Sequence, residues 1–253
     1  MSSLPSFAQP PVRRVSTGFL VERASSSVGD LFDFCRSRLL DDYPTQHEHP
    51  AEELYRETPW GETPSIKIDL GSLMGVASQP NLQVHCLAAD KSWGVKIQRD
   101  WVQVSWNRST AEAEYPRWLA VRDRAETVIT AFLEDFGGHT SQVEVQYFNT
   151  VETGAAARIV SAEFAGKALG EMESLRIHTH HLFEIGDTKA RLHLDVSPST
   201  GTNELELSLT VRGRLGEANP IEALEFADGA RNRIVTGFAD ITSEEFHNEW
   251  RKQ

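Results

Sequence analysis

The sequence predicts an α+β fold with antiparallel sheets, long helices packed on one side of them, and two similar strand-then-helix halves. Runs of alternating apolar and polar residues, typical of half-buried strands, follow one another with short turns between them. After each series of strands comes a long segment with helical spacing of apolar residues. The chain has 253 residues, of which 40% are hydrophobic, so it is long enough to bury a core. We expect one compact unit over residues 1–253, with sub-halves at 1–152 and 153–253.

The first half is predicted to begin with a strand and a capped helix. Val12 to Val21 contains β-branched and apolar residues without helical spacing, which favours a strand. A helix should begin near Ser27, because Asp30 follows three residues later as in a capping box, and it should end before Pro44. The stretch from Asp41 to Pro64 is acidic and contains four prolines, which predicts a long surface connection.

Further strands and a long helix complete the first half. Only Arg99 and Asp100 separate two of the predicted strands, which indicates a tight hairpin. The helix begins at Pro116, whose ring suits a first helical turn, and ends at Gly137 and Gly138. The predicted strands are Ser65 to Leu70, Leu82 to Leu87, Trp93 to Gln98, Trp101 to Trp106 and, after the helix, Gln142 to Phe148.

The second half follows the same plan with different residues. Apolar and polar residues alternate at 175–185, 192–196 and 205–211, which predicts a three-strand meander with one face against an apolar layer. Asn219 is placed to cap a helix with Pro220 in its first turn and Glu222 at its third position. A last short helix carries Phe246 and Trp250 four residues apart.

Several short segments stand out along the chain. They are PPVRRV followed by Gly18, the pair Tyr43-Pro44, VQVSWNR leading to YPRW, and TGFADITSEEFHNEW near the end. In their order and spacing they resemble a sporadically distributed bacterial family of conserved hypothetical proteins of about this length. The resemblance covers nearly the whole chain apart from roughly residues 151–177. It implies no particular activity, cofactor or catalytic residue.

Charge and cysteine content narrow the classes of function. Against 25 Lys and Arg stand 37 Asp and Glu, a net charge of -12, so nucleic acid and anionic membranes would be repelled unless a basic patch formed. Two cysteines are too few for a disulfide scaffold and favour a reducing compartment. The N-terminus lacks the pattern of a secretory signal, and no run approaches the roughly 18 apolar residues of a membrane span. We therefore expect a cytoplasmic protein.

The most concentrated set of chemically active side chains lies on the predicted meander of the second half. With Asp187-Thr188 as a hairpin tip, His180 would face Asp195 and Glu184 would face Arg191 on the next strand. On the third strand, Glu206 would lie near Asp195. Residues two apart on a strand point to the same side, so the polar residues of the three strands share one face of the sheet. Together with one tryptophan of the first half they form the candidate partner or ligand face, which consists of His178, His180, His193, Asp195, Glu184, Glu206 and Trp101.

Three interpretations of this face stay open. Two imidazoles on one side of a strand, with carboxylates one strand over, suit a divalent metal ion. The same acids would favour imidazolium and make binding depend on pH. The third interpretation is an ordinary solvated face of an antiparallel sheet with a cross-strand His–Asp pair.

Two further groups of residues are considered. Trp101 shares its strand face with Gln103 and Ser105, so of the tryptophans we expect it to be the exposed one. His47 and His49 lie in the acidic connection, where solvated loop residues are expected in preference to a cation site, because ordering a loop costs entropy.

No complete catalytic set is found. The sequence lacks GxSxG, a Walker loop, a dinucleotide glycine pattern and HExxH, so we assign no catalytic, cofactor-binding or metal-ligating residue and expect no cofactor. We expect an interaction protein that binds a protein partner, or itself as a homo-oligomer, through a sheet face. The alternative is an enzyme, or a small-ligand or metal-binding protein, that uses the His/Asp/Glu cluster.

Overall fold

The computed structural model describes residues 5–22, 27–52, 54, 56–58, 82–110, 112–152, 176–199 and 204–251. The predicted strand Ser65 to Leu70 and most of residues 151–177 lie outside this part of the chain. In chain order the elements are β1 (Val12–Glu22), α1 (Val28–Phe34), the π-helical continuation η1 (Cys35–Leu39), β2 (Thr45–Pro50), β3 (Leu82–Leu87), β4 (Trp93–Gln98), β5 (Trp101–Asn107), α3 (Arg117–Phe136), β6 (His139–Glu152), β7 (Ile177–Ile185), β8 (Thr188–Pro198), β9 (Glu204–Ala218), α5 (Pro220–Ile241) and α6 (Glu244–Arg251).

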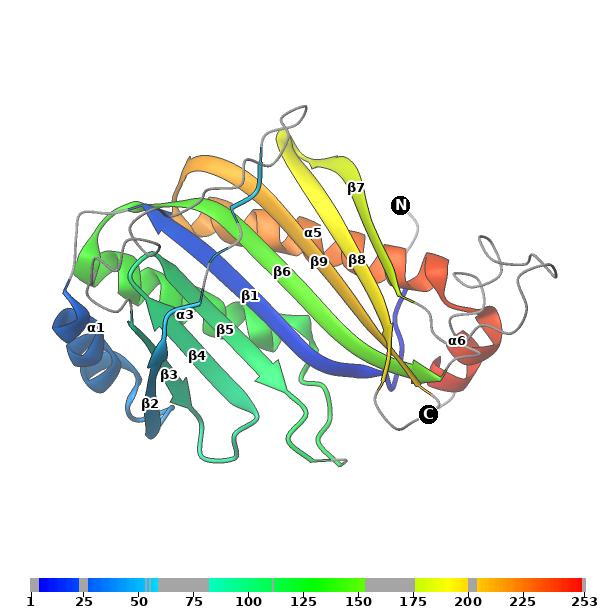
Figure 1. The fold of residues 1–253 in the computed structure, drawn as a ribbon, viewed down its shortest axis with the longest axis horizontal. Coiled ribbons are helices and arrows are strands. Elements are labelled where there is room, and N and C mark those ends of the chain that lie inside the picture. The colour runs from blue at the N-terminus through cyan, green and yellow to red at the C-terminus, as the bar shows by residue number, and fades with distance from the viewer. Residues whose placement is uncertain are drawn as a thin grey trace, which may run out of the picture.

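The strands form one antiparallel sheet, where the sequence suggested more than one. Its nine described strands lie in the order β2-β3-β4-β5-β1-β6-β9-β8-β7 (Figure 1). The long pairing of β1 with β6, from Val12 opposite Asn149 to Glu22 opposite His139, joins all the strands into this single sheet. The predicted boundary between residues 152 and 153 falls at the end of β6, which pairs with both β1 and β9.

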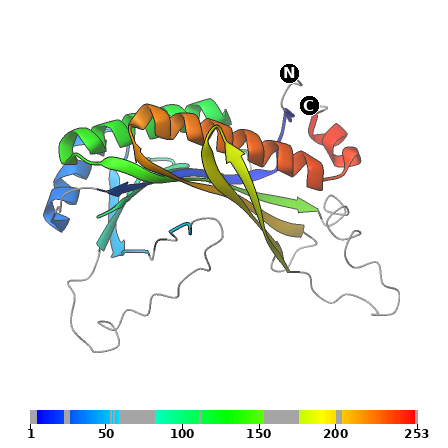
Figure 2. The same cartoon turned by 90° about the horizontal axis from the view of Figure 1, so that it is seen from above.

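Both long helices cover the same face of the sheet, as Figure 2 shows. Helix α3 packs on β5 and β1, and α5 packs on β6 and β9. Alternate residues of each strand point into this layer, which gives a mixed α+β fold whose core lies between helices and sheet. The opposite side of the sheet, which points away from α3 and α5, is called the distal face below. The polar residues of the alternating strand pattern lie on this distal face.

The predicted starts of α1 and α5 are confirmed, and α3 begins at Arg117, one residue after the predicted Pro116. At α1, Ser27 Oγ accepts a hydrogen bond from the Asp30 amide at 3.2 Å, and the Ser27 amide donates to the Asp30 carboxylate at 2.7 Å. At α5, the amide of Glu222 donates to Asn219 Oδ1 at 3.1 Å, and the Asn219 amide donates to the Glu222 carboxylate at 2.9 Å. These reciprocal bonds satisfy amides that the first helical turn leaves without partners.

Two expectations for the first half are wrong. The segment Asp41 to Pro64 is not only a surface connection, because Thr45–Pro50 forms the edge strand β2 against β3, and Glu57 is buried. The two histidines of this segment therefore lie on a strand and not in a loop. Trp101 is not exposed: it retains 8% of its accessible surface, because its ring lies against Gly18 on β1, where a side chain would overlap it.

None of the helices in the described ranges has the length and apolar character that crossing a lipid bilayer requires.

Candidate functional site

The β7–β8 hairpin sets the positions of the histidines. Its turn is formed by Gly186 and Asp187, one residue earlier than predicted, because Gly186 adopts a φ of 56° that suits the first position of a two-residue turn. As a result His180 lies opposite His193, and His178 lies opposite Asp195. The register differs from the predicted one by two residues, so every side chain keeps its predicted face but changes its partner.

The same two-residue difference applies to β9. Asp195 pairs with Ser208, His193 pairs with Thr210, and Glu206 lies opposite Ser197 rather than Asp195. Glu206 still lines a shallow groove of the distal face together with His178 and Asp195.

Of the seven members of the predicted face, four come together, Glu206 lies beside them in the groove, and two lie elsewhere. Glu184 lies opposite Lys189 beside the hairpin turn, away from the histidines. Trp101 is on β5, and β1, β6 and β9 separate that strand from β8. The residues that converge are His178, His180, His193 and Asp195.

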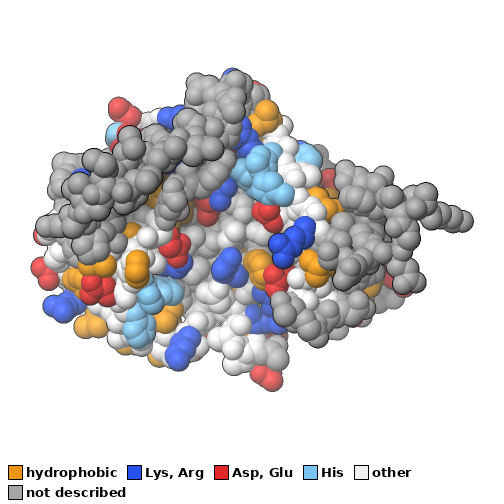
Figure 3. All heavy atoms as spheres, in the orientation of Figure 1, with side chains coloured by type: hydrophobic (Ala, Val, Ile, Leu, Met, Phe, Trp, Pro, Cys, Tyr) orange, Lys and Arg blue, Asp and Glu red, His pale blue; other side chains and the backbone are white. Residues whose placement is uncertain are grey.

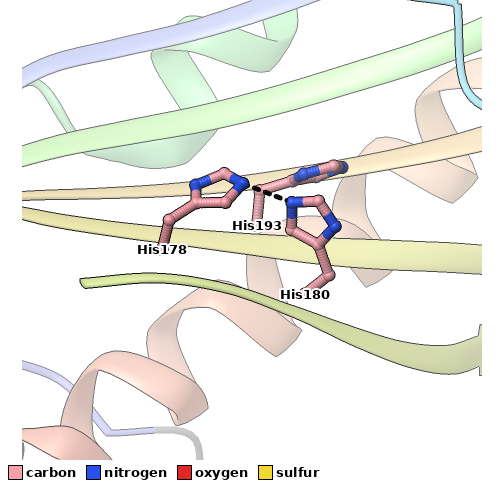
Figure 4. Close-up of side chains that lie close together, drawn as sticks. All are labelled: His178, His180 and His193. Carbon is pink, nitrogen blue, oxygen red and sulfur yellow. Dashed lines mark hydrogen bonds between the residues drawn. The ribbon is translucent and has the colours of Figure 1, made fainter. Parts of the chain in front are cut away.

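The three imidazoles form a compact cluster on the distal face. One ring nitrogen of each lies within 4.8 Å of the ring nitrogens of the other two. Nε2 of His178 and Nε2 of His180 are 2.5 Å apart, and the ring centroids of His180 and His193 are separated by 4.4 Å. Figure 4 shows the rings gathered above two neighbouring strands, with the dashed line joining His178 and His180. This group is called the histidine cluster below.

Carboxylates hold two of these rings by the nitrogen that points away from the cluster. His178 Nδ1 pairs with the Asp195 carboxylate, so a proton on Nδ1 leaves Nε2 with a lone pair. His193 Nε2 pairs with Glu57 Oε2 at 3.0 Å, which by the same reasoning leaves Nδ1 with a lone pair. In protein metal sites a carboxylate commonly fixes the tautomer of a ligating histidine in this way.

Glu57 is the residue that links the cluster to the rest of the sheet. It is 6% exposed, its carboxylate also pairs with Arg191 on β8, and its backbone amide donates to Gln142 Oε1 on β6 at 2.7 Å. The segment after β2 therefore reaches across the distal face and supplies a buried anion beside His193.

The surroundings of the cluster favour neutral imidazoles. Burial, with Arg212 and Arg191 nearby, lowers the pKa of His193 from 6.5 to about 4. Burial, followed by the neighbouring His193 and His178, also lowers the pKa of His180. His178 and Asp195 remain accessible, with side-chain exposures of 58% and 51%. At neutral pH His180 and His193 thus offer uncharged nitrogen atoms as ligands.

Such an arrangement has a specific chemical use. Neutral imidazole is the usual nitrogen ligand of zinc and other divalent transition metals, and three such donors leave one coordination position for water or substrate. The residues able to act as ligands are His178, His180 and His193, with Asp195 and Glu57 behind two of them.

The sequence interpretation missed two of the residues that shape the site. Glu57 was included in a surface connection, and Arg191 was placed opposite Glu184. A local pattern cannot identify a pairing across 134 residues. The available signal was an arginine on a strand face that also carries histidines, since a buried guanidinium needs a counter-charge.

A second group of histidines lies on the distal face at the other end of the sheet. His47 on β2 pairs with His85 on β3, and the ring of His49 lies 6.3 Å from that of His47 and 6.1 Å from that of His85. Pale-blue histidine side chains accordingly appear in separate places in Figure 3. Within the described residues, only the His178 group brings three ligand atoms close enough to hold one metal ion.

Comparison with known proteins adds no family to this description. A scan against protein-family models gives no match, and a search of curated protein sequences gives none either.

Proposed function

We propose that this chain binds a divalent transition metal ion, with zinc the best fit, through His178, His180 and His193. The observation that carries the proposal is the convergence of one ring nitrogen from each of these residues within 4.8 Å. In a tetrahedral site with Zn–N bonds of about 2.0–2.1 Å, ligand nitrogens are about 3.3 Å apart. The separations in the cluster run from 2.5 Å to at most 4.8 Å, so small side-chain movements suffice.

The tautomers also support metal binding. The Asp195 carboxylate pairs with Nδ1 of His178 and the Glu57 carboxylate with Nε2 of His193, so each carboxylate fixes the tautomer in which the opposite ring nitrogen can ligate a metal ion. In the metal-free protein the proton of neutral His180 lies on Nε2 and is shared with Nε2 of His178. Metal binding moves this proton to Nδ1 of His180, so that the metal ion takes its place between the two nitrogens.

Three histidines and an accessible fourth position would leave a metal-bound water exposed on the distal face. Zinc in such sites lowers the pKa of its water to about 7 and can activate that water for hydrolysis. The groove lined by His178, Asp195 and Glu206 lies directly beside this position and is where a substrate would approach.

The test is zinc titration of metal-free protein by calorimetry, with metal content measured after dialysis. We expect one zinc per chain, and about 100-fold or greater loss of affinity when His178 and His193 are both replaced by alanine. His181→Ala is the matched control, because His181 is exposed and lies on the same strand but on the opposite face. Zinc affinity unchanged in the double variant, or reduced equally in the control, would overturn the proposal.

A second candidate function is self-association through β7. This strand ends the order of the described strands, and Leu182 on it is 52% exposed. An edge strand with free backbone groups can pair with the same strand of a second copy. Light scattering after size exclusion would then give a dimer. Leu182→Pro would convert it to a monomer, because the amide of Leu182 points away from β8 in this register and proline cannot donate to a second copy. A monomer at all concentrations would rule this candidate out.

The chain order of the elements suggests two related units, and we include this in the proposal. β1 pairs with β5, which leads into α3, and β6 pairs with β9, which leads into α5. The units would be residues 12–136 and 139–241, each a first strand, a meander and a long helix. Separate expression of residues 139–253 as a folded domain would support them.

A further inference from the structure

We propose that the cavity beneath the N-terminal segment binds a small apolar carboxylate. The cavity has a volume of about 140 Å³ and lies among the segment before β1, the start of α3, β6 and α5. It is on the helix side of the sheet, whereas the histidine cluster is on the distal face. The two sites are therefore independent.

The charged residues that line the cavity favour an anionic ligand. Arg117 and Arg231 line it, and none of the described Asp or Glu residues does, although the chain as a whole carries a net charge of -12. The ion pairs among the described residues do not include Arg231. Its Nε is buried and makes no hydrogen bond within the described part of the chain. The rest of the guanidinium has partners, since Nη1 donates to Asn232 Oδ1 at 3.0 Å in an exposed position and the side chain also bonds the Tyr147 hydroxyl. The buried Nε–H is the donor for which the described residues supply no acceptor, and a carboxylate would supply one.

Two tyrosines add a hydroxyl donor. The hydroxyls of Tyr115 and Tyr147 are 2.8 Å apart, and burial raises the pKa of both. Both therefore stay neutral at physiological pH. One O–H serves their mutual hydrogen bond, so the other remains to donate to a ligand oxygen. Together with Arg231 this provides two donors for one carboxylate.

The rest of the lining fits an apolar body. A cavity of about 150 Å³ is known to hold benzene, so the volume here suits a ring or branched chain of six to eight carbon atoms. A fully solvated inorganic anion would leave this lining without contacts. The apolar side chains around the cavity are Phe7, Trp118, Ile234, Val235 and Phe238.

The wall over the cavity is fixed by contacts of its own. Arg117 donates to the carbonyl oxygens of Phe7 at 2.8 Å and Ala8 at 2.9 Å, and the Gln9 amide donates to the Trp250 carbonyl at 3.0 Å. Arg117 does so from a φ of 73°, which is unfavourable for a residue with a side chain and is found mostly where a site requires it.

The experiment is calorimetric titration of the full chain with sodium benzoate, benzyl alcohol and inorganic phosphate. We expect benzoate to bind with a dissociation constant of about 1 mM or tighter. Arg231→Gln should weaken benzoate about 10-fold or more and leave benzyl alcohol within about two-fold. Arg233→Gln is the matched control on the same helix, because its guanidinium lies over the Phe183 ring, 5.0 Å from the centroid, and not in the cavity.

Val235→Phe provides a second variant that keeps both charges and fills the cavity, so it should abolish benzoate binding while the fold, followed by circular dichroism, is retained. Benzoate binding unchanged in Arg231→Gln, phosphate binding as tight as benzoate, or no saturable benzoate binding would each overturn the proposal. Zinc titration of the same variants should be unaffected, which separates this test from that of the histidine cluster.

Discussion

Glu57 accepts a hydrogen bond from Nε2 of His193 at 3.0 Å, across 136 residues of sequence. The same carboxylate pairs with Arg191, which lies two residues before His193 on β8. A residue without regular secondary structure thus fixes the orientation of one ring of the histidine cluster and neutralises the guanidinium beside it. The position of the segment after β2 and the geometry of the cluster are therefore linked.

Replacing Glu57 should destabilise the protein strongly. Glu57→Gln keeps the shape of the side chain but leaves the Arg191 guanidinium, 11% exposed, without its counter-charge. We expect the free energy of unfolding in urea to fall by about 2–4 kcal/mol. Glu52→Gln is the control, because Glu52 pairs with Lys96 at the surface with 56% exposure, and its loss should cost less than about 1 kcal/mol. Equal effects would contradict a buried role for Glu57.

The stability of the metal-free protein should rise with pH between about 4 and 6.5. In the folded state the pKa of His193 is lowered to about 4 by burial and by Arg212 and Arg191, although Glu57 and Asp195 also face the cluster. Below pH 6.5 the unfolded chain takes up a proton that the folded chain does not, so the free energy of unfolding falls as pH falls, by up to about 3 kcal/mol.

Urea unfolding in chelator across this range measures the effect. His193→Gln should remove most of the slope, whereas His139→Gln, at a partly exposed position on β6, should keep it. A slope that survives in His193→Gln would assign the pH dependence to other groups.

The elements of the fold were largely predictable because their signals are local. Capping by Ser27 and Asn219, and strand alternation in Leu82–Leu87 and Trp93–Gln98, depend on residues a few positions apart. The single sheet was not predictable, because it depends on β1 pairing with β6 over more than a hundred residues. Alternation shows which face a strand buries but not which strand lies beside it.

For the candidate site, the sequence likewise predicted the face on which the histidines lie but not their partners on neighbouring strands. The two-residue period of a strand keeps His178, His180 and His193 on one face in any register that differs by an even number of residues, so the two-residue difference left the cluster intact. The predicted exposure of Trp101 was wrong, because the polar neighbours on its own strand do not reveal that Gly18 on the next strand leaves room for its ring. The burial of Glu57 was not predicted, because its partners Arg191 and His193 lie far away in the sequence.

Gly18→Ala should disturb the packing of Trp101. A Cβ at position 18 would overlap Cζ2 of the indole ring, so the ring, which is only 8% exposed, would have to shift from its packed position. We expect a loss of about 1–3 kcal/mol in the free energy of unfolding and a red shift of tryptophan emission. Gly29→Ala in α1 is the control: its nearest heavy atom, Ser27 Oγ, is 3.5 Å away, and alanine should stabilise that helix by up to about 1 kcal/mol. A neutral Gly18→Ala would show that the Trp101 ring is not confined.

Asp195→Asn should weaken zinc binding without removing a ligand. Asp195 pairs with Nδ1 of His178, and its negative charge makes Nε2 of that ring a stronger electron-pair donor to a metal ion. The same pairing holds the ring of His178 toward His180. Loss of such a partner typically costs about 10- to 100-fold in metal affinity. Glu184→Gln is the matched control, because Glu184 is an exposed carboxylate on the same face of β7 that lies opposite Lys189. Both substitutions remove one negative charge, so equal losses in a zinc titration would mean that Asp195 acts through general attraction of cations. A loss confined to Asp195→Asn would show that it acts through the ring of His178.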